Sequence, residues 1–357
     1  MRRPALAWFP IVLLAVGCSA AQSAATSESS TTVGLASEAT TTTRAPAGAG
    51  ATTTTADVTS TSAAADTTAP PTSQPPQPEF VPNPPPPGAT VCDRFTTITE
   101  VGRIGEPALV ESSGIAASRT HQGVYWLHND SGDDASIYAV TADGTALGEW
   151  SLEGVIAFDW EDMAIGPGPS RGVDYLYVAD IGDNFEFRPE VIVHRLPEPD
   201  PRAGGAATDI VSFRLRYPIS PTDAEAVVVD PINGDLLIIT KSDAGRSIVL
   251  RAAGVAAIES DTVLEMTEVA TLQLGSGGLA TAADLSRDGT MIAVRGYDQV
   301  WMWPRSERDL GVAFAEPPCA APSPVERQGE ALAFTADGLG YVTVSEGSGV
   351  PLWQVGP

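Results

Sequence analysis

The sequence predicts an all-β protein, and more narrowly a β-propeller, from three observations. Short apolar runs rich in Val, Ile, Leu, Tyr and Trp recur from residue 92 to the C-terminus, with no convincing amphipathic helix between them. Asn-Gly and Asp-Gly pairs separate several of these runs, and such pairs are typical of tight β-hairpins. The runs also fall into five similar units, which is the pattern of a radially repeated fold.

Each unit begins with a small or acidic residue and a short apolar run, followed by a turn and a stronger apolar run. We expect these two runs to be the two inner strands of one blade. In chain order they are 113–118 with 124–127, 161–165 with 175–178, 225–230 with 236–239, 281–285 with 291–294, and 330–334 with 341–344.

Two outer strands should complete each unit. They are expected at 136–140 and 147–152, 191–196 and 210–217, 248–251 and 267–274, 300–303 with a weak run near 312–315, and 351–355 in the last unit. The last unit lacks a fourth strand, while a spare strand, 95–104, precedes the first. We expect this N-terminal strand to close the fifth blade, because closure removes open sheet edges. Five blades are the prediction; a sixth, within 196–222 or 252–280, is the alternative.

The N-terminus indicates export from the cytoplasm. Arg2 and Arg3 precede an apolar run, 5–17, that is too short for a permanent membrane span but typical of a signal peptide. Small residues then lead directly into Cys18, a pattern that resembles a bacterial lipobox. We therefore expect Cys18 to be lipidated and the protein to be extracytoplasmic, anchored to the membrane of the cell envelope. The alternative is an ordinary secretory signal cleaved after a nearby alanine.

Composition divides the rest of the chain into a tether and a domain. The stretch that follows the signal is almost entirely Thr, Ala, Ser and Pro, and it cannot bury enough apolar surface to offset the entropy of ordering. The predicted layout is a signal peptide at 1–17, a lipidated cysteine and disordered tether at 18–91, and a propeller at 92–357.

The charge balance limits the classes of partner. The chain has 45 Asp and Glu against 20 Lys and Arg, a formal net charge of −25. So acidic a protein is not expected to bind nucleic acid, whose phosphates would repel it. Cations, or simply solubility as a monomer, suit this charge better.

The three cysteines fit an oxidising compartment. If Cys18 carries lipid, Cys92 and Cys319 remain as an even pair. Cys92 precedes the strand assigned to blade 5, and Cys319 follows the weak outer strand of blade 4, so neighbouring blades should bring them together. We expect a Cys92–Cys319 disulfide; two buried free thiols are the alternative. Without a Cys-x-x-Cys motif or a Cys/His cluster, zinc is not expected.

Candidate functional residues converge on one end of the predicted channel. In a propeller, the start of each first strand and the end of each second strand face the same mouth. The first-strand carboxylates are candidate Ca²⁺ ligands, because hard oxygen donors suit that ion. These candidate metal ligands are Asp159, Glu161, Asp223, Glu225 and Glu330. The candidate ligand-binding residues at the same mouth are Glu111, His128, Asn129, Asp130, Asp180, Asp183, Asn184, Lys241, Arg295 and Glu346.

The carboxylates at the mouth also have a purely structural interpretation. Carboxylates at a channel mouth can cap backbone amides or pair with Lys241 and Arg295, which would make their role structural.

The run 168–172 matches the Gly-x-Ser-x-Gly pattern, but that motif needs a strand-to-helix elbow and here lies in a strand-to-strand turn. We do not expect Ser170 to be a nucleophile.

Several motifs carry a family resemblance. The segments 160–164, 181–184, 223–226 and 328–333 resemble secreted actinobacterial β-propeller lipoproteins of unassigned activity, over essentially all of 92–357. The Glu-x-Met/Leu-Ala strands are more distantly similar to β-propeller phytases and esterase-like phytase proteins. In phytases, axial carboxylates hold Ca²⁺ ions that bind phosphate while water attacks. That resemblance implies Glu161, Glu225 and Glu330 as Ca²⁺ ligands.

Two classes of function follow. The first is a non-enzymatic module that binds a ligand or protein at the acidic mouth, with Ca²⁺ as its candidate cofactor. The second is a Ca²⁺-dependent hydrolase of a phosphoester, ester or lactone, in which Glu161 would take a proton from water. The sequence lacks a nucleophile motif and has only Lys241 and Arg295 to clamp an anion. These features favour the binding module and argue against phytate as a substrate.

Overall fold

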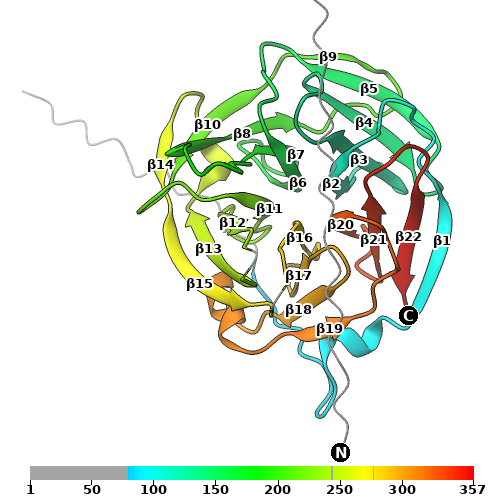
Figure 1. The fold of residues 1–357 in the computed structure, drawn as a ribbon, viewed down its shortest axis with the longest axis vertical. Helices are drawn as coiled ribbons and strands as arrows, with labels where there is room; N and C mark the ends of the chain where they lie inside the picture. The colour runs from blue at the N-terminus through cyan, green and yellow to red at the C-terminus, as the bar shows by residue number, and fades with distance from the viewer. Residues whose placement is uncertain (1–78, 243, 276) are drawn as a thin grey trace, which may run out of the picture. The chain divides into compact units, whose positions relative to one another are not determined.

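The computed structural model describes residues 79–242, 244–275 and 277–357, which form five β-sheets arranged as the blades of a β-propeller (Figure 1). Blade 1 contains β2 (Ser112–Ala117), β3 (Val124–Asn129), β4 (Ser136–Thr141) and β5 (Ala146–Leu152). Blade 2 contains β6 (Trp160–Pro167), β7 (Asp174–Asp180), β8 (Glu190–Pro197) and β10 (Val211–Arg216). Blade 3 contains β11 (Ala224–Val229), β12 (Leu236–Thr240), β13 (Arg246–Ala252) and β15 (Thr267–Gln273). The predicted strands of these three blades are confirmed.

Blade 5 combines strands from distant parts of the chain. It contains β20 (Gly329–Phe334), β21 (Tyr341–Ser345), β22 (Pro351–Gly356) and, at its outer edge, β1 (Thr97–Arg103). Strand β1 runs antiparallel to β22, with Thr97 opposite Gly356 and Arg103 opposite Pro351. The inner strands β2, β6, β11, β16 and β20 contact one another in that order, and β20 contacts β2, so the ring is complete.

Blade 4 corrects one sequence-based expectation. It contains β16 (Ala282–Leu285), β17 (Met291–Arg295), β18 (Val300–Pro304) and β19 (Cys319–Ala321). The run near 312–315, expected to be a weak outer strand, instead belongs to a 3₁₀ helix, η3 (Leu310–Ala315). The Asp309 side chain accepts a hydrogen bond from the Gly311 amide and caps this helix. Leu310, Ala313 and Phe314 are buried at helical spacing, which explains why helix prevails over strand.

The alternative of a sixth blade is wrong. Besides outer strands of blades 2 and 3, the two segments considered for it contain β9 (Gly205–Ala207) and β14 (Val263–Glu265), each only three residues long. Strand β9 pairs in parallel with β5 of blade 1, and β14 pairs in parallel with β10 of blade 2. Both therefore extend existing sheets as fifth strands. Strand β9 lies between two strands of blade 2 in the sequence but pairs with blade 1. Strand β14 lies between two strands of blade 3 but pairs with blade 2, so both short strands connect neighbouring blades.

The hydrophobic core lies between the blades rather than around one centre. Five buried apolar clusters each combine strands of two neighbouring blades. Each sheet therefore buries both faces, which accounts for the long runs of buried residues in the inner strands. Within the described residues, no helix has the length and apolar character that a membrane crossing requires.

The predicted disulfide between Cys92 and Cys319 is confirmed, with a Cα–Cα distance of 6.1 Å. Cys92 lies in a short 3₁₀ helix, η1 (Val91–Arg94), and Cys319 is the first residue of β19. Cys319 thus lies in the outer strand of blade 4, not after it as expected. The bridge connects the segment that leads into β1 of blade 5 to the neighbouring blade.

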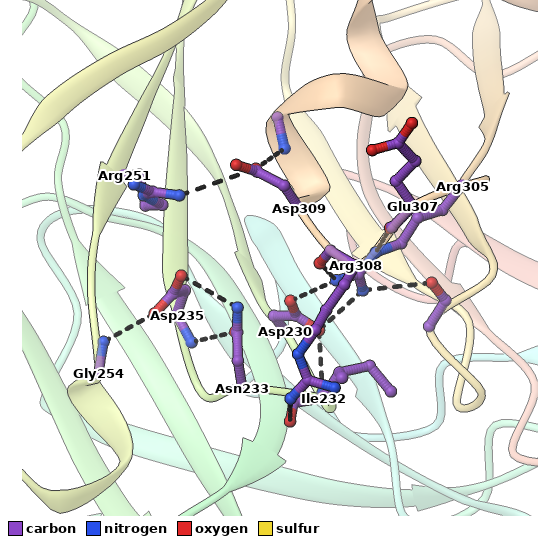
Figure 2. A network of polar contacts seen from close by, with 12 residues as sticks. Asp230, Ile232, Asn233, Asp235, Arg251, Gly254, Arg305, Glu307, Arg308 and Asp309 are labelled. Atoms are coloured by element: carbon purple, nitrogen blue, oxygen red, sulfur yellow. Dashed lines mark hydrogen bonds and ion pairs between the residues drawn. The ribbon is translucent and has the colours of Figure 1, made fainter. Parts of the chain in front are cut away.

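Figure 2 shows a second link between elements, a network of polar contacts around Asp230 and Arg305. Asp230 follows the end of β11, so the network lies at the channel end opposite the candidate mouth. Arg305, which follows β18, donates two hydrogen bonds to the Asp230 carboxylate, at 2.9 and 2.8 Å. Both side chains are fully buried. The Arg305 guanidinium also lies 4.7 Å from the centre of the Phe80 ring. This contact brings the first described residues against the turn between β11 and β12.

The predicted signal peptide and Cys18 lie outside the described residues, as does most of the predicted tether. Of the tether, the structure describes only 79–91, in which residues 79–90 are irregular and Val91 begins η1. A further 3₁₀ helix, η2 (Val255–Ala257), lies in the connection after β13.

Candidate functional site

Four of the five inner strands carry an irregularity at the same place. The pairing of β2, β6, β11 and β20 with their neighbours shifts by one residue at Ser113, Glu161, Glu225 and Glu330. Such a bulge changes the direction of the side chain relative to regular alternation. The repeated acidic position seen in the sequence is therefore a repeated bulge, with a glutamate in three blades.

The equivalent residues in blades 1 and 4 are Ser113 and Thr281, whose side chains form hydrogen bonds with the backbone of the neighbouring blade. The Ser113 hydroxyl donates to the Glu161 carbonyl of the next blade. The Thr281 hydroxyl donates to the Gly329 carbonyl, at 2.9 Å. These two hydroxyls link neighbouring inner strands, which leaves the three glutamates as the chemically distinctive members of the ring.

Three carboxylates come together at the mouth between blades 1 and 2. One oxygen each of Asp130, Asp159 and Glu161 lies within 4.8 Å of the other two. Asp130 follows β3, Asp159 precedes β6, and Glu161 lies on the bulge of β6. The sequence analysis assigned Asp159 and Glu161 to a metal site but Asp130 to ligand binding. We name these three residues the carboxylate triad.

The Glu161 side chain is the buried member of the triad. Glu161 is only 4% exposed, and its carboxylate has no hydrogen bond or ion pair to any described residue. The backbone at Gly182 lies directly against it: a Cβ atom at this position would be 2.2 Å from Glu161 Oε1 and 2.5 Å from Asp159 Oδ2. Glycine is thus required here by the close approach of the backbone to the triad.

Glu225, predicted as a metal ligand, instead has a cationic partner. The Lys241 ammonium forms an ion pair with Glu225 Oε1 and lies 5.4 Å from the centre of the Tyr297 ring. Burial alone would lower the pKa of Lys241, but the interaction with Glu225 raises it. Burial raises the pKa of Glu225, and Lys241 opposes that shift. Lys241 therefore remains protonated and supplies the charge that a metal ion would otherwise supply to Glu225.

The other two predicted metal ligands lie outside the triad. Asp223 Oδ1 accepts a hydrogen bond from the Asp183 amide, at 2.9 Å. Glu330 is buried on its bulge, and its pKa is affected by both Lys241 and Glu346. Both residues line the same acidic mouth, since the pKa of Asp130 is affected by Asp223 and that of Glu225 by Glu330.

Three of the predicted ligand-binding residues hold the loops of the mouth in place. The Asn129 side chain accepts from the amides of residues 110 and 111 and donates to the Asp133 carboxylate. Asp180 pairs with Arg188 at 2.7 Å and accepts from the amides of residues 158 and 159. Asp183 accepts from the amides of residues 187 and 188. These partners make the three side chains part of the scaffold that positions the triad.

Two other predicted ligand-binding residues are buried. The His128 ring packs edge-on against Trp160, with ring centroids 5.4 Å apart, and burial lowers the pKa of this histidine. Arg295 is fully buried, pairs with Glu326 and donates to the Ala331 carbonyl at 2.9 Å. Neither is placed to meet a ligand in solution.

The remaining predicted residues lie at the surface of the mouth. Glu111 and Asn184 are exposed, and Glu346 is partly buried. Burial raises the pKa of Glu346, and the charges of Asp130 and Glu111 raise it further. Glu346 of blade 5 and Glu111 before blade 1 therefore extend the acidic surface beyond the triad.

The sequence analysis missed two acidic residues of the inner strands. The Asp162 carboxylate accepts hydrogen bonds from the amides of Val227, at 2.9 Å, and Ala283, at 3.2 Å, which belong to blades 3 and 4. The Asp284 carboxylate accepts from the Phe334 amide of blade 5, at 2.7 Å. These carboxylates hold inner strands together across blades. Their only sequence signal is a polar residue inside an otherwise apolar inner strand.

The triad and its neighbours are held at raised pKa values. Burial, followed by the charge of Asp130, raises the pKa of Asp159 to about 6. Burial and then the nearby Glu225 raise the pKa of Glu161 well above its usual value. Burial raises the pKa of Glu330 to about 7. Near neutral pH these carboxyl groups therefore retain protons that a bound cation would displace.

These shifts predict that the cation-free protein loses stability as pH rises. An acid whose pKa is higher in the fold than in the unfolded chain makes folding less favourable between the two values. The pKa of Asp159 rises from 3.8 to about 6 and that of Glu330 from 4.5 to about 7. We expect the melting temperature in EDTA, followed by circular dichroism, to fall from about pH 5 to about pH 7.

The Asp159→Asn and Glu330→Gln variants should show a shallower fall than the wild type. Asp209→Asn, at an exposed position, is the matched control and should follow the wild-type profile. A melting temperature that is constant or rises over this pH range would contradict the raised pKa values.

Comparison with known proteins does not place the chain in a family. No family model matches the chain, and no curated protein matches it. Among solved structures, the chain is similar to one titled "Crystal structure of Nidogen/Laminin Complex". The TM-score is 0.39 and the sequence identity 11%, over 66% of this chain and 73% of that chain. Similarity at this level says nothing about what the present chain binds. The resemblance to actinobacterial lipoproteins and to phytases stays a prediction.

Proposed function

We propose that this protein is an extracytoplasmic β-propeller that binds its ligand at the acidic mouth through a Ca²⁺ ion held by Asp130, Asp159 and Glu161. The observation that carries the proposal is the convergence of three carboxylate oxygens within 4.8 Å around a buried glutamate that has no partner among the described residues. A buried carboxylate without a partner is costly, and a cation would remove that cost.

Calcium suits this donor set better than other common metals. All three side chains offer hard oxygen atoms, and neither a cysteine nor a histidine belongs to the triad. Ca²⁺ takes about six to eight oxygen ligands, so three carboxylates leave coordination positions for water or for oxygen atoms of a ligand. The ion would thereby connect the buried triad to a molecule arriving at the mouth.

Calorimetric titration of the protein with CaCl₂ tests this proposal directly. We expect Ca²⁺ to bind the wild type and to bind Glu161→Gln roughly 10-fold or more weakly, because the variant loses one of three charged ligands. Gly182→Ala should weaken binding similarly, since the new methyl group would occupy the space against Glu161 and Asp159. Gly356→Ala is the matched control, because a Cβ there meets nothing within 4 Å.

Wild-type protein that binds no Ca²⁺, or variants that bind it as tightly as the wild type, would refute the proposal. The alternative of a Ca²⁺-dependent hydrolase is tested on the same preparations with generic phosphoester, ester and lactone substrates. Turnover that requires Ca²⁺ and is lost in Glu161→Gln would replace the binding module by an enzyme.

The same proposal includes attachment to the cell envelope through lipid on Cys18, which lies outside the described residues. The Cys92–Cys319 disulfide supports export, because such bonds persist in oxidising compartments. We expect Cys18→Ala to move the protein from the membrane fraction to the soluble fraction in cell fractionation, since two acyl chains anchor firmly where none would. Unchanged membrane retention of the variant would exclude the lipid anchor.

A further inference from the structure

Five exposed apolar side chains lie at the mouth end of blade 2 and in its connection to blade 3. The exposed fractions are 81% for Ile156, 55% for Phe158, 85% for Phe185, 58% for Phe187 and 91% for Ile219. They come from the segment before β6, the loop after β7 and the segment before β11. Large exposed apolar side chains grouped at one end of a soluble protein commonly mark an interaction site. We name these five residues the apolar rim.

The rim lies next to the candidate metal site along the chain. Phe158 directly precedes Asp159 of the triad, and its ring lies 6.4 Å from that of Phe187 in an edge-to-face arrangement. Gly182, whose backbone lies against the triad, is the second residue of the loop that carries Phe185 and Phe187. The Asp183 amide donates to Asp223, four residues beyond Ile219, which ties this loop to the segment leading into β11.

The loop of the rim is held in a defined conformation. Glu186, between the two exposed phenylalanines, has a positive φ of 52°, which is uncommon for a residue other than glycine, asparagine or aspartate. Arg188 is buried and donates to the Gly182 carbonyl at 2.7 Å and to the Asp180 carboxylate at 2.7 Å. Its guanidinium lies 4.8 Å from the centre of the Phe158 ring. Strained backbone that is held by surrounding contacts is typical of functional loops.

We propose that the apolar rim and the acidic mouth together bind a separate protein through a segment that presents one Lys or Arg flanked by aromatic or other large apolar side chains. This inference rests on the proposed function, in that the mouth is the binding site. Of the charged groups around the mouth, Lys241 is already paired with Glu225. A Ca²⁺ ion in the triad would still leave Glu111 and Glu346, at the surface of the mouth, to attract a cationic side chain.

The direction of the chain argues that the occupant is another molecule. The Phe80 ring contacts the Arg305 guanidinium beside the turn between β11 and β12. This turn lies at the end of the channel opposite the mouth. Of the residues before Glu79, only Arg2, Arg3 and Arg44 are basic. The first two belong to the predicted signal peptide, and Arg44 stands between Thr43 and Ala45, with no large apolar neighbour. The preceding segment therefore lacks the chemistry that would fill the site.

Three labelled peptides that differ in one feature at a time test the inference by fluorescence anisotropy. Ser-Phe-Arg-Phe-Ser carries both features, Ser-Phe-Glu-Phe-Ser reverses the charge, and Ser-Ser-Arg-Ser-Ser lacks the aromatic side chains. The full exported chain with Cys18→Ala is used in saturating CaCl₂. We expect the first peptide to bind roughly 10-fold or more tightly than either of the others. The second peptide loses the electrostatic contact with the mouth, and the third loses the aromatic contacts with the rim.

The variants assign the effect to the two surfaces. Phe185→Ser/Phe187→Ser should abolish the preference for the aromatic peptide, and Glu111→Gln/Glu346→Gln should abolish the preference for Arg over Glu. Leu339→Ser is the matched control, because Leu339 is 62% exposed and lies in the turn after β20, at the opposite end of the channel. It should bind all three peptides as the wild type does.

Each other outcome overturns the inference. Equal binding of the three peptides, or no binding, would exclude this partner chemistry. Binding to phosphatidylglycerol vesicles that depends on Phe185 and Phe187, without a peptide preference, would make the rim a membrane contact. Self-association lost in the same variant would make it a contact between copies. Ca²⁺ calorimetry on the same preparations separates this result from the proposed metal site, because the rim variant should retain Ca²⁺ binding.

Discussion

Replacing Arg305 by methionine should lower the free energy of unfolding by about 3–5 kcal/mol. The substitution would leave the Asp230 carboxylate fully buried without its charged partner, and it would remove the stacking contact with Phe80. Leaving a buried charge unpaired is far more costly than losing an exposed ion pair. Urea denaturation of the variant and the wild type measures the effect.

Two comparisons make this result specific to the buried pair. Arg305→Met/Asp230→Leu should recover much of the lost stability, because no charge then remains buried without a partner. Arg216→Met removes a half-exposed arginine that pairs with Glu190 and Glu265, and it should cost at most about 1 kcal/mol. If Arg305→Met were no more destabilising than Arg216→Met, the pair would not be the link that the structure indicates.

Removing the disulfide should have an effect of similar size. Cys92→Ser/Cys319→Ser should lower the free energy of unfolding by about 2–5 kcal/mol. The two cysteines are 227 residues apart, and cross-linking so long a loop restricts the unfolded chain strongly. The bridge also stabilises the closure of blade 5. Strand β1 is far from the rest of this blade in the sequence and is held in the sheet by its pairing with β22.

Urea denaturation with and without a reductant is the measurement, and Cys18→Ala is the common background. The wild-type disulfide protein should lose stability on reduction, whereas the double serine variant should not respond. An equal unfolding midpoint for the two proteins without reductant would mean that the bridge contributes nothing to stability.

The strands of the blades could be predicted from the sequence because their signals are local. Two short continuous apolar runs and the turn at Asn233-Gly234 between them define β11 and β12 without reference to the rest of the chain. The expected strand near 312–315 failed for an equally local reason, since the Asp309 cap and the spacing of Leu310, Ala313 and Phe314 favour a helical turn. The short strands β9 and β14 had no such signal, because only their pairing with another blade makes them strands.

For the candidate site, the kind of side chain and the end of the channel could be predicted from the sequence, because each acidic position recurs at the same place in its unit. Which of these side chains meet depends on the packing of the blades. Packing of the blade 1 and blade 2 loops brings Asp130 close to Asp159 and Glu161, whereas Glu225 forms an ion pair with Lys241 and lies outside the triad. Distances between side chains on separate loops depend on how whole blades pack, and a linear pattern of residues carries no record of that packing.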